Sequence, residues 1–76
     1  SSPTGRLLLA RIYLAAGDAD GARRTLWEAF HDLPADRSVY EALRALLLRL
    51  EGPLAAQRLA RDFEDQKTDK MTRSFA

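Results

Sequence analysis

The sequence predicts an all-α fold of two antiparallel helix–turn–helix hairpins, followed by a short C-terminal helix or tail. Its 76 residues are dominated by alanine, leucine, arginine and glutamate, which lose little conformational freedom in a helix. Between short breaks rich in glycine, proline and aspartate, apolar residues recur at helical spacing. Turns this short join helices that lie antiparallel. The breaks fall at 17–21, 33–36, 51–53 and, more weakly, at Thr68-Asp69.

Each of the four predicted helices has an apolar face that is expected to form the core. The first helix covers about residues 4–16, and the others follow the successive breaks. Helical spacing assigns their inward faces. In chain order these are Leu8, Ile12 and Ala15 flanked by Leu9, Tyr13 and Ala16; Ala22, Leu26, Ala29, Phe30 and Leu33; Tyr40, Leu43, Leu47 and Leu50 flanked by Val39 and Leu46; and Ala56, Leu59, Ala60 and Phe63.

Helix start signals follow the breaks. A short polar side chain before a helix accepts hydrogen bonds from its first free N–H groups, and proline suits the first turn. The candidates are Asp18 or Asp20 for the second helix, Asp36 or Ser38 for the third (Ser38 with Glu41 as a capping box), and Pro53 after Gly52 for the fourth.

Composition excludes several classes of protein. Twelve basic and eleven acidic residues give a net charge of +1, so the chain lacks the excess of positive charge that is typical of nucleic-acid-binding proteins. Without cysteine there is no disulfide framework, and no apolar run reaches the roughly 18 residues of a membrane span. The excess of arginine over lysine, together with abundant alanine and leucine, indicates a bacterial source. The compartment stays open, with the cytoplasm slightly favoured over the periplasm.

Two stretches of the first hairpin carry a resemblance to a known family. Leu9-Ala10-x-x-Tyr13 and Gly17-Asp18-x-Asp20-x-Ala22 are similar to the first helix and the turn of the tetratricopeptide repeat, whose period is about 34 residues. Leu26, Ala29 and Pro34 follow at the expected places, and Arg6 departs from the pattern. The small acidic turn is therefore predicted to be the corner of a helical hairpin rather than a loop that carries chemistry.

A second, more degenerate unit is predicted over residues 37–70. Tyr40 and Leu43 match the first helix of the repeat, as Ala56, Ala60 and Phe63 match the second. Two departures concern its helix packing. Arg44 stands where a small residue is usual, and Gly52 comes one position late. The predicted division is thus a flexible or added lead-in over 1–5, a repeat domain over 6–67, and a tail over 68–76 that caps the domain or begins a truncated repeat.

The resemblance implies a concave groove, lined by the first helix of each unit, that binds a peptide or helix of a partner protein. The lysine and asparagine set with which some members clamp a terminal carboxylate is missing. Surplus leucines on this face either contact a partner or pack on a neighbouring repeat. The positions that the resemblance assigns to recognition are Leu7, Arg11, Leu14, Ala15, Glu41, Ala45, Leu48 and Arg49.

No catalytic, cofactor or metal site is predicted. His31 has Glu28 and Asp32 nearby, but its place near a helix end favours a solvated side chain that complements the helix dipole. The carboxylate pairs Asp18/Asp20 and Asp62/Asp65 have no adjacent nucleophile, and no phosphate-binding or hydrolase motif is present. Arginines of the second helices are expected to form i, i+4 ion pairs, namely Arg24–Glu28, Arg58–Asp62 and Arg61–Asp65.

The function that these observations favour is a protein–protein interaction module, an adaptor or scaffold fragment of a larger, bacterial protein. Two alternatives stay open: a regulatory helical-repeat domain of a bacterial transcriptional activator, and a purely structural segment of a solenoid. Trp27 either covers the edge of the core or anchors an interface. Weak self-association through Leu7, Leu48 and Phe75 is also expected, because the ends of a cut solenoid are apolar.

Overall fold

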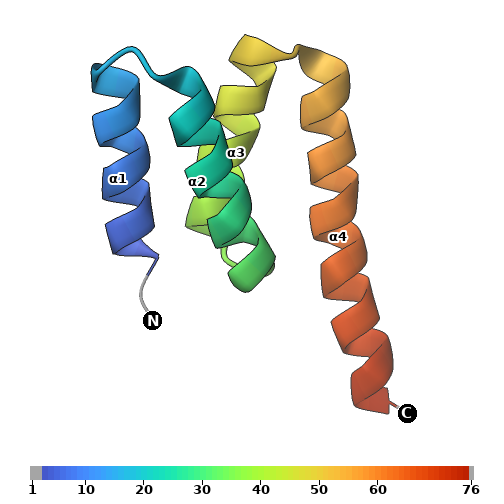
Figure 1. The fold of residues 1–76 in the computed structure, drawn as a ribbon. Helices are drawn as coiled ribbons and strands as arrows, with labels where there is room; N and C mark the ends of the chain where they lie inside the picture. The colour runs from blue at the N-terminus through green and yellow to red at the C-terminus, as the bar shows by residue number, and fades with distance from the viewer. Residues whose placement is uncertain (1–2, 76) are drawn as a thin grey trace.

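The computed structural model of the chain describes residues 3–75, with the side chains of residues 3–66. It contains four helices: α1 (Thr4–Ala15), α2 (Ala19–Asp32), α3 (Arg37–Leu50) and α4 (Pro53–Phe75). Each helix packs against the next one in the chain, and α1 and α4 form the two edges of the row (Figure 1). The all-α class and the two antiparallel hairpins are confirmed. The expected contribution of Phe75 to self-association lies outside the described side chains.

The corner between α1 and α2 is closed by backbone hydrogen bonds and one carboxylate. Gly17 has a positive φ of 80°, and the N–H of Asp18 donates to the carbonyl of Tyr13 at 2.8 Å. The Asp18 carboxylate then accepts from the N–H of Gly21 at 2.9 Å, capping α2. Between the two candidate caps, the structure selects Asp18, because Asp20 already lies inside the helix. The hairpin corner predicted from the glycines and aspartates is confirmed.

The N-terminus of α3 is capped by Asp36, not by Ser38. The Asp36 carboxylate accepts from the N–H of Val39 at 3.0 Å and from the hydroxyl of Ser38 at 2.6 Å. These two bonds, the one from Ser38 first, stabilise the charged form and lower the pKa of Asp36 below its ordinary value of 3.8. The predicted capping box does not form, since Ser38 lies inside α3 and is not its N-cap. The Glu41 carboxylate instead lies 3.7 Å from the guanidinium of Arg37.

One core runs through all four helices. A stack of Tyr40 and Phe63, with ring centroids 4.1 Å apart, joins α3 to α4, and Arg37 lies over the same phenylalanine ring. The inward faces predicted for α2 and α4 are confirmed, apart from partial exposure of Leu33 and Ala60. The buried apolar residues are Ala10, Ala22, Leu26, Ala29, Phe30, Val39, Leu43, Leu46, Leu47, Ala56, Leu59 and Phe63.

The inward face predicted for α1 is wrong. Leu8 and Ile12 are 52% and 63% exposed, and the core instead receives Leu7 and Ala10. Of the predicted residues of α1, Tyr13 packs against the core. Helical periodicity cannot choose a face here, because α1 carries apolar residues almost all round its axis. The remaining corrections are the exposure of the predicted core residues Leu9, Ala15, Ala16 and Leu50.

The weak break predicted at Thr68-Asp69 does not end α4, which continues to Phe75 as one 23-residue helix. Threonine and aspartate are only mildly unfavourable within a helix, and residues 54–75 contain neither glycine nor proline. The tail is therefore an extension of α4 rather than a separate element (Figure 1). Among the helices described, none combines the length and the apolar character that a membrane crossing requires.

The sequence distance between equivalent helices of the two hairpins differs by one residue between their first and second helices. α3 begins 33 residues after α1, whereas α4 begins 34 residues after α2. With the shift of 33, buried Ala10 corresponds to buried Leu43, and Arg44 points to solvent. The arginine that stood out against the repeat pattern therefore does not lie at the helix crossing. The longer α3, with 14 residues against 12, delays the second turn to Gly52, where φ is 100°.

Candidate interaction groove

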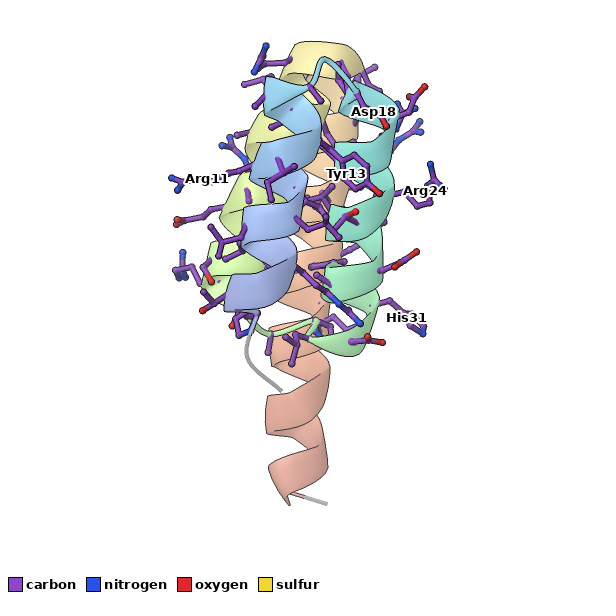
Figure 2. All side chains as sticks on the ribbon, turned by 60° about the vertical axis from the view of Figure 1, so that its left-hand side comes forward. Arg11, Tyr13, Asp18, Arg24 and His31 are labelled. Carbon is purple, nitrogen blue, oxygen red and sulfur yellow. The ribbon has the colours of Figure 1, made fainter. Side chains whose placement is uncertain are left out.

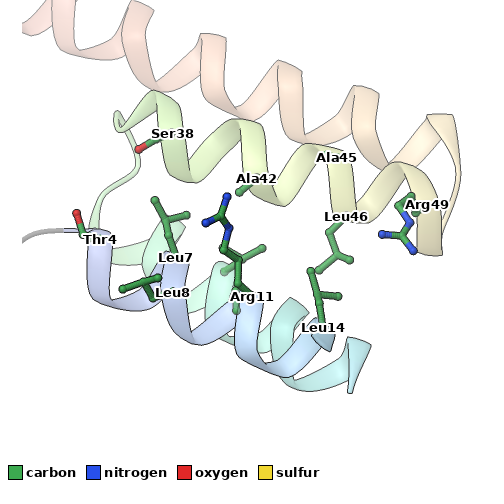
Figure 3. A pocket seen from close by; sticks show the side chains of 12 residues that line it. Thr4, Leu7, Leu8, Arg11, Leu14, Ser38, Ala42, Ala45, Leu46 and Arg49 are labelled. Atoms are coloured by element: carbon green, nitrogen blue, oxygen red, sulfur yellow. The ribbon is translucent and has the colours of Figure 1, made fainter. Parts of the chain in front are cut away.

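A groove of about 560 Å³ runs between α1 and α3 (Figure 3). Small side chains at Ala42 and Ala45 leave it open, because α3 contributes little bulk on this side. Apolar groups dominate the lining, and polar side chains lie mainly at its ends. The lining residues are Thr4, Leu7, Leu8, Ala10, Arg11 and Leu14 of α1, Leu26 of α2, and Ser38, Ala42, Ala45, Leu46 and Arg49 of α3.

The structure brings together five of the residues assigned to recognition from the sequence: Leu7, Arg11, Leu14, Ala45 and Arg49. The remaining three, Ala15, Glu41 and Leu48, are exposed outside the groove lining. On α3 the steps of about 100° per residue turn Glu41 and Leu48 beyond Ala45, away from α1.

Sequence reasoning assigned Ala45 and Arg49 of α3 to recognition but missed Ser38 and Ala42, which lie on the same side of the groove. Ser38, Ala42, Ala45 and Arg49 recur at spacings of three and four residues, which place them on one helical face. That face contains small and polar residues, so a search for an apolar stripe passes over it. On α1 the missed residues include Thr4 and Leu8, the second of which is predicted to lie in the core.

Arg11 and Arg49 supply the positive charge of the groove. Arg11 lies near its middle and Arg49 at one end, with Thr4 and Ser38 at the other (Figure 3). Within the described residues, neither guanidinium has a carboxylate at ion-pair distance. A guanidinium without an internal partner is available for a carboxylate of a bound molecule.

The i, i+4 ion pairs predicted for α2 and α4 do not form within residues 3–66. Exposed side chains gain little free energy from such pairs and lose conformational freedom. Arg23 instead links the two hairpins, with its guanidinium 2.5 Å from Asp20 and 3.1 Å from Glu51 at the end of α3. The pairs that are absent from this part of the chain are Arg24–Glu28, Arg58–Asp62 and Arg61–Asp65.

A second, shallower hollow lies beside the end of α2. Two of its lining residues, Arg6 and Asp32, form an ion pair at 2.6 Å. His31 is exposed in the last turn and points away from the helix (Figure 2). Trp27 packs edge-on against Phe30, with centroids 6.0 Å apart, while part of its ring stays exposed. Trp27 therefore covers the edge of the core and also presents apolar surface.

A comparison to known families agrees with three features of this structure. These are the order of the helices, the close corner between α1 and α2, and the groove between α1 and α3, the first helices of the two hairpins. The profile of the tetratricopeptide repeat matches residues 2–47, more than half of the chain. The chain belongs to the tetratricopeptide repeat family. No curated protein and no solved structure shows significant similarity to it.

Tetratricopeptide repeats generally mediate contacts between proteins and are typically non-enzymatic. In this tetratricopeptide chain the match covers α1, α2 and most of α3, which are the three helices that contribute to the groove. At the level of the family, then, the chain is a protein–protein interaction module.

Proposed function

We propose that this tetratricopeptide chain binds a peptide or helical segment of a partner protein in the groove between α1 and α3. The observation that carries the proposal is the combination of an apolar floor with two guanidiniums that lack carboxylate partners among the described residues. A volume of about 560 Å³ accommodates a few side chains rather than the face of a globular domain.

The chemistry of the lining defines the partner segment. Leu7, Leu14 and Leu46 offer apolar contacts that become favourable when large apolar side chains leave water. Arg11 and Arg49 favour carboxylates, which guanidiniums bind with paired hydrogen bonds. The proposed ligand is therefore an acidic segment with apolar anchors, and Glu41 and Leu48 outside the groove influence it less.

Two matched series of amphipathic peptides test this proposal. They share the same leucine positions, and one series carries glutamate where the other carries lysine. We expect the glutamate peptides to bind tighter by about tenfold or more, measured by fluorescence anisotropy of labelled peptides. The double substitution Arg11→Glu with Arg49→Glu should remove or reverse that preference without lowering the helix content.

Arg24→Glu is the matched control, because Arg24 is exposed on α2 and points away from α1 (Figure 2). It makes the same change of charge outside the groove and should leave the preference intact. If Arg24→Glu abolishes binding while the groove variant binds normally, the groove assignment is wrong. Trp27 would then be the better place to search for the contact surface.

A further inference from the structure

The side of α1 that faces away from the other helices is apolar from Leu8 to the C-terminal end of the helix. Leu8, Leu9 and Ile12 are 52%, 41% and 63% exposed, and Ala15 and Ala16 continue the same side. Arg11 and Tyr13 point to opposite sides of α1, and the apolar face lies between them (Figure 2). We call these five residues the outer α1 face.

The opposite edge of the molecule has a different character. There, within residues 53–66, α4 exposes Gln57, Arg58, Arg61 and Glu64, and Leu54 is the one large apolar side chain exposed in that part of the helix. If copies stacked head to tail, α4 of one copy would meet the outer α1 face of the next. Its charged groups would then lose water without gaining partners, which is unfavourable. An occupant of the outer α1 face must instead present an uncharged surface.

A second copy of the same helix meets this requirement. When two α1 helices lie antiparallel about a two-fold axis at Ile12, Leu8 faces Ala16 of the other copy, and Leu9 faces Ala15. Large side chains then oppose small ones on both sides of the axis, and the two Ile12 side chains meet at its centre. Such self-complementarity is what a two-fold interface requires.

We propose that the outer α1 face is a homodimer interface with antiparallel α1 helices paired about Ile12. Twelve helical residues span about 18 Å, so one helix face buries far less than the roughly 800 Å² per partner of a stable interface. The dimer is accordingly weak and forms at high concentration. It differs from the expected association through Leu48, which lies on α3.

Sedimentation equilibrium tests the association itself. The apparent mass should rise from 8.5 kDa towards twice that value as the concentration approaches about 1 mM. Ile12→Glu should hold it at the monomer mass with unchanged helix content, since the replaced side chain is exposed. Leu54→Glu places the same charge on the exposed opposite edge and should leave the association unchanged. Ile12 is chosen over Leu8 because Leu8 also lines the groove.

The absence of cysteine permits a direct test of the two-fold axis. Ile12→Cys should oxidise to a covalent dimer much faster than Leu54→Cys, because only the first brings its own thiols together at the axis. An unmodified chain that stays monomeric throughout, or equal rates for the two cysteine variants, would overturn the proposal. Association that survives Ile12→Glu, or preferential cross-linking of Ile12→Cys to Leu54→Cys, would overturn it too.

Discussion

The ring of Tyr13 lies directly against the backbone of Gly21, so that a Cβ at position 21 would be only 2.7 Å from Tyr13 Cδ1. The same Cβ would lie 2.7 Å from a carboxylate oxygen of Asp18, the residue that caps α2. Helices α1 and α2 therefore approach each other closely at their shared corner because position 21 has no side chain.

Gly21→Ala should destabilise the fold by about 1–3 kcal/mol, since the Tyr13 ring or the helix must move to admit the methyl group. For a chain of this size, that loss lowers the melting temperature by about 4–8 °C per kcal/mol. Thermal unfolding followed by circular dichroism measures it. Gly5→Ala is the control: nothing lies within 4 Å of its added Cβ, and replacing a helical glycine should raise stability by up to about 1 kcal/mol. Equal melting temperatures for the two variants would contradict the close approach.

Ala22→Leu tests the packing next to this corner. Ala22 is fully buried and belongs to the same core cluster as Ala10 of α1. Three extra carbon atoms have no space there, so we expect a loss of about 1–3 kcal/mol in the free energy of unfolding. Arg24→Leu adds an apolar side chain at an exposed position of the same helix and should change stability by about 0.5 kcal/mol or less. Chemical denaturation of both variants measures the difference, and an unchanged midpoint for Ala22→Leu would refute this arrangement.

Phe63→Ala tests the attachment of α4 to α3. Phe63 is buried and stacks on Tyr40 with an interplanar angle of 4°. Removing the ring should cost about 3–5 kcal/mol, through lost burial and the cavity that it leaves. Trp27→Ala removes a larger ring whose exposed part contributes less, so its cost should be smaller. Urea denaturation of the pair gives both values, and a larger loss for Trp27→Ala would show that α2 rather than α4 carries the main aromatic packing.

The Asp36 cap predicts a dependence of stability on pH. Because folding lowers the pKa of this carboxyl, its ionisation stabilises the folded chain above the ordinary value of 3.8. That contribution is lost as the pH falls through the lower, folded-state pKa. Asp36→Asn keeps an N-cap acceptor but cannot titrate. The melting temperature of the wild type relative to Asp36→Asn should therefore be constant near neutral pH and decline below about pH 4.

The comparison between Asp36 and Asp36→Asn also removes the effect of the other carboxylates, which titrate in both chains. If the melting temperature of the wild type relative to Asp36→Asn instead rose as the pH falls, the assignment of Asp36 as the cap would be contradicted. Asp36→Ala removes the acceptor altogether and should cost about 1 kcal/mol at neutral pH. Ser38→Ala removes the largest cause of the lowered pKa and should shift the decline to higher pH.

Local patterns in the sequence were sufficient for the hairpins and much of the core. Gly17 and Asp18 predict the first corner because a positive φ and an N-terminal cap are short-range properties of the chain. The faces of α2 and α4 follow from their periodicity, since polar residues cover the other side of each helix. The sequence does not distinguish position 36 from position 38 as the cap of α3, because both side chains can accept hydrogen bonds from N–H groups of the first turn, and the residue at which the helix starts decides between them.

The sequence by itself determined that this chain forms short antiparallel helices, and where most of them turn. Only the tertiary structure decided which side of α1 is buried, because its apolar residues surround the helix and either side could face α2. The same holds for the groove, because the α3 residues that line it depend on which face of α3 lies towards α1. Local periodicity indicates which residues share a helix face, whereas contacts between distant segments determine whether that face packs against another helix or stays in solvent. For that reason Leu8 and Ile12 are on the surface, and Ala42 and Ala45 form the wall of the groove.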